Sequence, residues 1–376
     1  MLVSGISIFF MTLILVMYFI RKVIYISHQK HLFDEPTESR KIHIGQTPNL
    51  GGIAIFTAMM FAACITLSFT TIPYVNYLSF SCLLLFITGL TDDLVGMDPY
   101  KKIGAQFVSA LTLTLFSGFR ITSFYGLFGI HEIPFALSIV VSVVLIVYLV
   151  NAFNLIDGIN CLAASIGLLA SSILAFYFGS LHDTGFMFLC IAMSGSLIGF
   201  LYYNRTPARI FMGDTGSLFL GFFVSIIAIR FLEDSNAVSN SSLIQYSAPS
   251  LVLALLIIPV YDTLRVFIVR IANRQSPFLA DRNHIHHQLL NIGLSHIQST
   301  GILVCINMLS VAMALLMRHV VFEIFILTIF SFMLAMNWIL GYLNERQRQQ
   351  GKDLMEELNS VPKLTIIRDH TNILET

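Results

Sequence analysis

Runs of about twenty predominantly apolar residues recur along this 376-residue chain, separated by short polar segments. A helix of that length crosses the roughly 30 Å of hydrocarbon in a bilayer. Hydrophobic residues make up 56% of the chain and charged residues 11%, which leaves too little polar surface for a soluble globule. The runs therefore predict a polytopic membrane protein whose solvent is the bilayer.

Eleven apolar windows begin near residues 3, 52, 77, 103, 134, 160, 186, 217, 248, 299 and 320. We therefore predict an all-α fold with about eleven transmembrane helices. Only Arg318 and His319 separate the last two windows, so ten spans with one kinked helix is the alternative. Residues 1–343 are expected to form a single integral membrane domain, and residues 344–376 a cytoplasmic C-terminal tail.

The distribution of basic residues predicts the orientation of the spans, because Lys and Arg tend to stay on the cytoplasmic side during insertion. Of the 21 Lys and Arg residues, 17 lie in segments 21–49, 92–102, 203–216, 270–298 and 344–376 on one side, Arg265 lies within an apolar run, and only Arg120, Arg230 and Arg318 fall on the other side. Arg21 and Lys22 follow the first apolar run, the reverse of the charge order in a cleavable signal peptide. We expect the N-terminus outside, the C-terminus in the cytoplasm, and the first helix retained.

Five polar segments interrupt the apolar pattern, each at the end of a run, and the alternation of the runs brings them all to the predicted cytoplasmic side. They are residues 41–43, 91–94, 151–160, 211–217 and 281–287. Ionisable groups at the membrane are costly and are usually functional. The pattern predicts an active site on the cytoplasmic face. The basic residues there suit phosphorylated substrates, although the ordinary positive-inside bias explains most of their excess.

Asp92 and Asp93 stand where an apolar helix leaves the hydrocarbon. Adjacent helical positions point about 100° apart, so the two carboxylates are expected to have different roles. One can face a reacting phosphate while the other contacts a metal ion or a lysine. Solvation of two acids at the interface is the structural alternative.

Asn151, Asn154 and Asp157 recur every three residues, which places three hydrogen-bonding side chains on one helical face. Gly158 and Asn160 then break the apolar pattern. Amide groups both donate and accept hydrogen bonds, so they suit a nucleotide base or the oxygen shell of a hard metal ion. A polar contact between helices would explain one such Asn but not three polar groups at this spacing.

Segment 211–217 opens an apolar helix with residue types that favour helix N-caps. A helix start of this kind offers free backbone N–H groups and the positive dipole end to a phosphate. Gly213 and Gly216 permit a close approach of the backbone, and Asp214 is a natural Mg²⁺ ligand. Capping alone would explain one acid but not both glycines.

Segment 281–287 contains His284, His286 and His287 in a basic loop that also holds Arg282. Three histidines suggest zinc. The other nearby candidates are carboxylates and amides, which suit Mg²⁺ or Mn²⁺, and no cysteine lies close in sequence. With Arg282 present, a cluster that binds pyrophosphate is the favoured interpretation and zinc the alternative.

Asp262 lies inside an apolar run, three residues after Pro259 and three before Arg265. An ion pair with Arg265 on the same helical face would satisfy its charge structurally. A catalytic role is the alternative, because ionisable groups within spans are usually functional. The spacing alone does not decide between them.

Together these segments resemble the polyprenyl-phosphate N-acetylhexosamine-1-phosphate transferase family, which includes the peptidoglycan-precursor translocase and the eukaryotic dolichyl-phosphate enzyme. The resemblance extends from about residue 34 to residue 287 with five motifs in the family's order. The His-Ile-His-His form is similar to the bacterial N-acetylglucosamine branch and differs from the three consecutive histidines of the translocase. One departure is Asn160-Cys161, where bacterial relatives usually have Asp-Gly. The matching residues are Asp34-Glu35-Pro36, Arg40 to His43, Pro48 to Gly52, Asp92-Asp93 with Lys102, Asn151 to Gly158, Phe211 to Ser217, and Asp281-Arg282 with the three histidines after Ser276-Pro277-Phe278.

The resemblance implies that a polyprenyl phosphate, such as undecaprenyl phosphate, attacks the sugar-bearing phosphorus of a UDP-sugar, here expected to be UDP-N-acetylglucosamine. The products are polyprenyl-diphosphate-sugar and UMP, the first step of a cell-envelope polysaccharide such as O-antigen. It also implies Mg²⁺, with Mn²⁺ as the alternative, held by Asp214 and Asn154. Asp92 is expected to be the base and Asp93 its support, while a covalent aspartyl-phosphate on Asp92 is the competing mechanism. The expected substrate-binding residues are Lys41, His43, Lys102, Asn151, Asp157, Asn160 at the uracil edge, Phe211, Arg282, His284, His286 and His287.

The expected partners are the UDP-sugar, the polyprenyl phosphate and the bilayer of a bacterial cytoplasmic (inner) membrane. No nucleic acid is expected, and a homodimer and another UDP-N-acetylhexosamine are left open. The rival class is a secondary transporter, which would place ionisable groups near the bilayer midplane at broken helices. Only Asp262 fits that description. A catalytically inactive scaffold would not need Asp92, Asp93 and Asp214 together.

Overall fold

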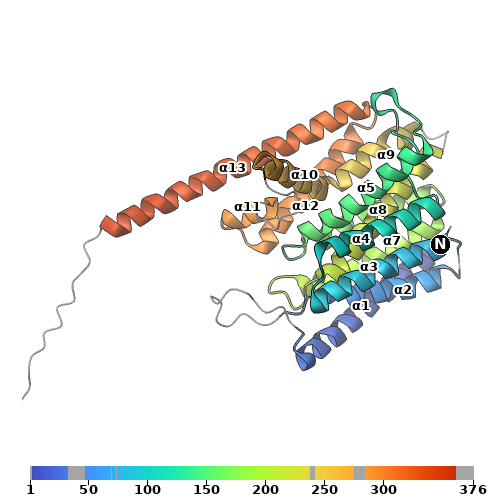
Figure 1. Ribbon diagram of the computed structural model, residues 1–376, viewed down its shortest axis with the longest axis horizontal. Coiled ribbons are helices and arrows are strands. Elements are labelled where there is room, and N and C mark those ends of the chain that lie inside the picture. Colours follow the sequence, from blue (N-terminus) through green and yellow to red (C-terminus); the bar gives the residue numbers. More distant parts are fainter. Residues whose placement is uncertain are drawn as a thin grey trace, which may run out of the picture.

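The computed structural model describes residues 2–32, 47–68, 70–72, 74–237, 242–274 and 284–360. Within these ranges the chain is helical and contains no strand (Figure 1). A short 3₁₀ turn, η1 (Leu127–Gly129), lies between α4 and α5. The helices are α1 (Leu2–Lys30), α2 (Gly51–Thr66), α3 (Val75–Val95), α4 (Pro99–Phe116), α5 (Phe135–Ile156), α6 (Leu162–Ser180), α7 (Thr184–Asn204), α8 (Gly213–Ala237), α9 (Ser242–Leu255), α10 (Ile257–Ala272), α11 (Ile285–Asn291), α12 (His296–Leu316) and α13 (Phe322–Ser360).

Eight helices in the described ranges are long and apolar enough to cross a membrane, and α9 with α10 forms a ninth if that bent pair is one span. The prediction of a multi-pass helical membrane protein is confirmed. Every predicted window coincides with a helix, but α2 has only 16 residues and α4 carries two lysines in its first turn. The count of eleven spans and their orientation stay predictions.

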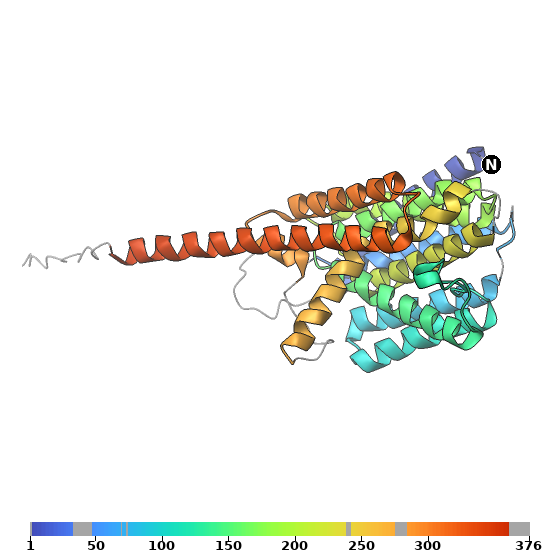
Figure 2. The same cartoon turned by 90° about the horizontal axis from the view of Figure 1, so that it is seen from above.

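The C-terminal helix differs in length from every other helix in the described ranges. α12 and α13 are separate helices, so the alternative of one kinked helix at Arg318 and His319 is wrong. α13 continues without a break across residues 343 and 344 to Ser360. Figures 1 and 2 show it projecting beyond the bundle at the end opposite the N-terminus.

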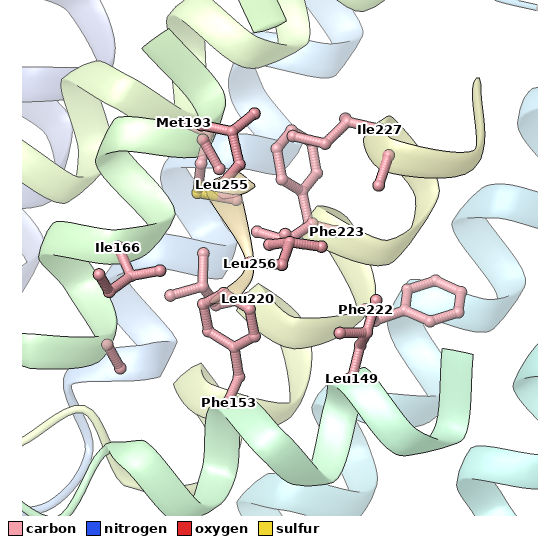
Figure 3. Packing of buried hydrophobic residues seen from close by; sticks show 14 of the residues in the cluster. Leu149, Phe153, Ile166, Met193, Leu220, Phe222, Phe223, Ile227, Leu255 and Leu256 are labelled. Atoms are coloured by element: carbon pink, nitrogen blue, oxygen red, sulfur yellow. The ribbon is translucent and has the colours of Figure 1, made fainter. Parts of the chain in front are cut away.

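α8 is the most enclosed of the candidate spans, with 94% of its apolar window buried. Leu220, Phe222, Phe223 and Ile227 of this helix pack among side chains from α5, α6, α7 and the α9–α10 junction (Figure 3). Lipid tails are as apolar as these side chains, so the hydrophobic effect does not drive helices together within a bilayer. Close packing of side chains is what favours their association. The first turn of α8 is therefore held in a fixed position at one end of the bundle.

The α9–α10 pair bends by 68° between Leu255 and Ile257. Pro259 explains the break, because it has no N–H for the Leu255 carbonyl and its ring would clash with that carbonyl in a straight helix. The freed carbonyl instead accepts a hydrogen bond from the Asn307 amide of α12 at 3.1 Å. The Tyr148 hydroxyl of α5 donates to the Val260 carbonyl at 2.6 Å, which ties α10 to α5.

Candidate active site

Backbone hydrogen bonds connect the segment that leads into α8 with Pro48 and the first turn of α2. The Phe211 N–H donates to the Pro48 carbonyl at 2.8 Å, and the Gly52 N–H donates to the Met212 carbonyl at 2.8 Å. A Cβ on Gly52 would lie 2.1 Å from the backbone nitrogen of Gly216, so only glycine permits this approach. The first turn of α8 is thus fixed by backbone contacts as well as by packing.

Asp93 caps α8 from the neighbouring helix α3. Its Oδ1 accepts from the Asp214 N–H at 2.8 Å, and its Oδ2 accepts from the Thr215 N–H at 2.8 Å and the Thr215 hydroxyl at 2.5 Å. A carboxylate at a helix N-terminus also interacts favourably with the helix dipole. The expectation that these N–H groups are free for a phosphate is therefore wrong for Asp214 and Thr215.

Lys102 of α4 bridges two carboxylates from different helices. Its ammonium donates to Asp92 Oδ2 at 3.0 Å and also donates to Asp214 Oδ2. The other oxygen of Asp92 accepts from the Met97 N–H at 2.6 Å. The side chains of Asp92 and Lys102 are partly buried, so their interaction is less screened than a surface pair. Two acids and one base that sequence analysis singled out therefore meet in space.

The amides of α5 have different partners. Asn154 donates to Asp214 Oδ1 at 2.7 Å and to the Ser217 hydroxyl at 2.9 Å. Asn151, one turn earlier, instead donates to Gln106 of α4 at 2.6 Å. Asn154 therefore joins the acidic cluster directly, whereas the amide of Asn151 is held by a buried partner on the next helix.

The turn after α5 carries two of the predicted substrate-binding positions, Asp157 and Asn160. Asp157 is partly accessible to solvent, but protein atoms surround most of its carboxyl group. Burial raises the pKa of this carboxyl well above its usual value, and the nearby charge of Asp93 raises the pKa further. Asn160 donates to the Thr206 hydroxyl at 3.0 Å, so its amide faces the loop that leads to α8. A Cβ on Gly158 would lie 2.6 Å from Nε2 of His286, which shows how closely the histidine helix packs on this turn.

The three histidines lie at the start of α11, and their rings contact one another. The rings of His284 and His286 are parallel to within 10° with centroids 5.5 Å apart, and those of His286 and His287 are 4.3 Å apart. Desolvation lowers the pKa of His286 to about 3, so the ring is neutral in the folded protein. Among the described residues, neither ring nitrogen of His286 has a hydrogen-bond partner.

Asp262 anchors this histidine segment to α10. Its Oδ2 contacts His284 Nδ1 at 2.9 Å, and its Oδ1 accepts from the Ile285 N–H at 2.9 Å. The guanidinium of Arg265 is farther away, at 3.7 Å. The expected pair with Arg265 therefore exists but is the longest of the three contacts.

Three predicted substrate-binding residues, Lys41, His43 and Arg282, lie outside the described residues. Their roles stay predictions. Of the remaining predicted positions, direct contacts join Asp92, Asp93, Lys102, Asn154 and Asp214 into one cluster. Asp157 adjoins this cluster through Asp93, and His286 adjoins the turn at Gly158.

Two cavities are lined by residues that the sequence predicted for the site. The first, of 470 Å³, is an apolar groove between α4, α5 and α10 with Asp92, Lys102 and Asn154 at its polar end and Arg270 in its wall. The second, of 980 Å³, is an open cleft lined by Asn160, His296 and residues of the 202–211 segment. Phe211, which is 41% exposed, contributes its ring to this cleft. The apolar groove thus ends at the cluster, whereas the cleft is lined by the predicted positions Asn160 and Phe211 and by none of the cluster residues.

The donor atoms at the cluster suit a hard divalent ion. Both N–H groups of the Asn154 amide are used, which leaves its carbonyl oxygen available beside the carboxylates of Asp214 and Asp92. Within the described ranges, no three His, Cys, Asp or Glu side chains converge as a metal site, which gives the zinc alternative no support there. Mg²⁺ does not require such a cage, because it commonly binds one or two carboxylates together with substrate phosphates.

Sequence analysis missed several contributing residues. Gln106 and Asn307 are buried polar side chains within apolar runs, and such residues in a membrane helix usually hydrogen-bond to another helix. That signal is present in the sequence, but it names no partner. Tyr148 and Arg270, which line the groove, carry no comparable signal.

Comparison with known proteins shows the family of the chain. A model of glycosyl transferase family 4 matches residues 74–232. A Bacillus subtilis protein named probable undecaprenyl-phosphate N-acetylglucosaminyl 1-phosphate transferase is 31% identical over 83% of this chain and 86% of its own length. The decaprenyl-phosphate N-acetylglucosaminephosphotransferase of Mycobacterium leprae is 32% identical over 68% of this chain and 70% of its own. The phospho-N-acetylmuramoyl-pentapeptide-transferase of Staphylococcus carnosus is 32% identical over 60% of this chain and 75% of its own length.

Fold and site together define a polytopic membrane protein with an acidic cluster at the mouth of an apolar groove. The chain belongs to glycosyl transferase family 4, the family of polyprenyl-phosphate N-acetylhexosamine-1-phosphate transferases. The resemblance inferred from the five polar segments is therefore confirmed.

Proposed function

We propose that this protein transfers N-acetylglucosamine-1-phosphate from UDP-N-acetylglucosamine to a polyprenyl phosphate such as undecaprenyl phosphate, in a bacterial cytoplasmic membrane. The products are polyprenyl-diphosphate-N-acetylglucosamine and UMP, and the lipid product would initiate a cell-envelope polysaccharide. The observation that carries the proposal is the cluster of Asp92, Lys102, Asn154 and Asp214 at the polar end of an apolar groove. The names of the relatives point to the same acceptor and sugar.

The groove suits the lipid substrate. Its wall is formed by apolar side chains of α4, α5 and α10, whereas its polar end holds Lys102 and Asp92. A polyprenyl chain in the groove would leave its phosphate beside the Lys102 ammonium, which can neutralise part of the phosphate charge. The nucleotide would then occupy the open cleft, where Asn160 offers an amide to the base and Phe211 a ring face.

Asp92 would accept the proton of the lipid phosphate; its position in the groove lining next to Lys102 supports this role. An oxygen of the lipid phosphate then forms a bond to the sugar-bearing phosphorus of the donor. The bond from that phosphorus to the bridging oxygen breaks, and UMP leaves with the electron pair. One phosphoanhydride replaces another, so catalysis depends on positioning and charge neutralisation.

Asp214 and the carbonyl oxygen of Asn154 would hold Mg²⁺, or alternatively Mn²⁺. The ion would supply charge neutralisation at the donor diphosphate. Lys102 bridges Asp92 and Asp214 and offsets their mutual repulsion. Both carboxylate oxygens of Asp93 accept hydrogen bonds from N–H groups in the first turn of α8, and these bonds fix the position of Asp214.

The test is incubation of purified protein with polyprenyl phosphate, Mg²⁺ and a panel of UDP-sugars while UMP is measured. UMP release that needs both lipid and UDP-N-acetylglucosamine is the expected result, and the lipid product with UMP should run the reaction backwards. Release from another UDP-sugar alone would correct the donor. No release from any donor would overturn the reaction.

A secondary transporter is the second candidate, and the bend between α9 and α10 is the observation that favours it. Asp262 follows that bend, but its oxygens are taken by His284 and the Ile285 N–H. A coupling-ion site at Asp262 would first have to break these contacts. Uptake of a labelled UDP-sugar into protein-containing vesicles without UMP formation would favour the transporter.

A further inference from the structure

The carboxylate of Asp262 links the bent α9–α10 pair to the histidine segment. This side chain is only 2% exposed, and an ionised carboxylate at that depth must be compensated by hydrogen bonds or charge. Its nearest partners are His284 and the Ile285 N–H, both at 2.9 Å, and not Arg265 of its own helix at 3.7 Å. Asp262 therefore joins α10 to the start of α11.

The contact determines which nitrogen of His284 carries the ring proton. A carboxylate only accepts hydrogen bonds, so Nδ1 of His284 donates to Asp262 Oδ2. Nε2 is then a hydrogen-bond acceptor in the neutral ring and a donor in the imidazolium. Nε2 has no hydrogen-bond partner among the described residues. The second oxygen of Asp262 holds the Ile285 N–H, which fixes the backbone next to the ring.

His284 is also connected to the candidate active site. Its ring stacks on His286, and His286 packs against Gly158 in the turn that follows Asn154 and Asp157. A displacement of the His284 ring would therefore be transmitted through His286 to this turn. A carboxylate that orients a functional histidine through its other ring nitrogen is a recurrent arrangement in enzymes.

We propose that Asp262 is a positioning residue, which fixes the tautomer and the ring orientation of His284 so that Nε2 contacts the diphosphate of the donor. The inference rests on the proposed function, because it assigns a role to the histidine segment in that reaction. Asp262 itself touches no substrate. It acts only through His284.

A double-mutant cycle tests this dependence. Asp262→Asn, His284→Gln and the double variant are compared by kcat and KM in the UMP-release assay. Asp262→Asn is expected to lower kcat/KM by about 10–100-fold, the range found when an orienting partner of a functional group is lost. The double variant is expected to be no worse than His284→Gln, because both changes remove the same interaction. Losses that multiply, or full activity of Asp262→Asn, would overturn the proposal.

A matched control separates positioning from stability. Asp183→Asn removes a carboxylate that is 13% exposed and pairs with Arg230 at 2.9 Å, between the residue before α7 and the C-terminal half of α8. It should lower the melting temperature and leave kcat/KM of the folded fraction unchanged. If Asp262→Asn behaved like this control, its role would be structural only.

The two proposals also fail in different ways. A wild-type protein that releases no UMP from any donor refutes the proposed reaction. Active wild-type protein with multiplying losses in the cycle refutes only the positioning role. The same cycle on thermal unfolding needs no substrate, and fully additive losses there would refute the Asp262–His284 contact itself.

Discussion

Asp92 and Asp93 are neighbours in sequence, yet their carboxylates have different partners. Asp92 lines the apolar groove and pairs with Lys102, whereas Asp93 caps α8 through two backbone N–H groups and the Thr215 hydroxyl. Adjacent positions on a helix point about 100° apart, which makes such a division possible. The two residues should therefore respond differently to the same substitution.

Asp92→Asn should lower turnover by roughly 10²–10⁴-fold while the affinity for the UDP-sugar stays nearly intact, because a general base is lost. The loss should shrink as pH rises above about 6, where the lipid phosphate becomes a dianion without help. Steady-state kinetics between pH 6 and 9 measure both effects. A variant that is inactive at every pH, together with exchange of labelled UMP into UDP-sugar in lipid-free wild type, would instead indicate the covalent mechanism.

Asp93→Asn should mainly destabilise the fold, by about 1–3 kcal/mol, because one of the two oxygens that accept hydrogen bonds from α8 becomes an NH₂ group and leaves a donor of α8 unsatisfied. Thermal unfolding in detergent, compared with Asp92→Asn, measures this difference. Turnover per folded molecule should fall less than in Asp92→Asn. Equal inactivity of the two variants with an unchanged melting temperature of Asp93→Asn would contradict the division of labour.

His286 supplies a pH-dependent contribution to stability. Its folded pKa of about 3 is below the unfolded value of about 6.5, so the unfolded chain binds a proton that the folded protein does not. The stability from this residue is complete above pH 6.5 and falls by about 1.4 kcal/mol per pH unit as pH decreases towards 3. The melting temperature of wild type should therefore drop more between pH 7.5 and 5.5 than that of His286→Phe. Identical drops would show that His286 accepts a proton without unfolding.

Most residues of the candidate site could be predicted from the sequence, because acids and amides at the ends of apolar runs are rare and costly. Their partners could not. The contacts of Asp93 with Thr215 and of Asn154 with Asp214 join positions far apart in the chain, and helical periodicity describes only one helix at a time. Asn151 illustrates the limit, since it has the expected spacing but pairs with Gln106.

At the scale of elements, glycines allow α2 and α3 to approach the backbone of α8. A Cβ on Gly89 would lie 2.6 Å from the backbone nitrogen and Cα of Thr215, and neither atom can move without shifting α8. Gly89 lies one turn before Asp92 and Asp93, so this contact sets the distance between their carboxylates and the first turn of α8. Small residues have this role in membrane helix packing generally.

Gly89→Ala should destabilise the protein by about 1–3 kcal/mol, the usual cost of overpacking, and should lower turnover because Asp93 is displaced from α8. Gly104→Ala is the matched control, since a Cβ there would have no atom within 4 Å. Alanine favours a helix over glycine, so this control should be neutral or more stable by up to about 1 kcal/mol. Thermal unfolding and UMP release measure both, and an equal effect of the two variants would contradict the packing argument.

The positions of the helices could be predicted from the apolar windows, whereas the bend between α9 and α10 was not predicted. Pro259 was visible in the sequence, but a proline inside a membrane helix can be accommodated in several ways. Here the break is stabilised by Asn307 of α12, which satisfies the Leu255 carbonyl. That contact belongs to the assembled bundle, so the angle could not be deduced from the α9–α10 sequence alone.

At the scale of the whole molecule, the proposed lipid and nucleotide substrates use different cavities: the groove ends at Asp92, Lys102 and Asn154, and the cleft is lined by Asn160 and Phe211. The groove opens between α4, α5 and α10, and several of its lining residues, such as Phe107 and Val144, are exposed on the surface of the bundle. A membrane-dissolved substrate can enter such a groove sideways, whereas a nucleotide must approach from water. The two substrates should therefore be separable by substitutions that affect only one path.

Val144→Trp tests the lipid path. Val144 is 62% exposed and lines the apolar part of the groove, so an indole ring there would occupy space needed by the polyprenyl chain. The KM for polyprenyl phosphate should rise on the order of tenfold, the usual effect of a modest misfit in an apolar pocket, while the KM for the UDP-sugar stays unchanged. Leu327→Trp on α13 is the control, because Leu327 is similarly exposed at 68% but lies outside the groove lining. If both variants raised the KM for polyprenyl phosphate equally, the bulk of tryptophan on the lipid-facing surface would be the cause. If neither variant raised it, the polyprenyl chain would have to bind elsewhere. Asp92 would then lose the access to the lipid phosphate on which its role as the base depends.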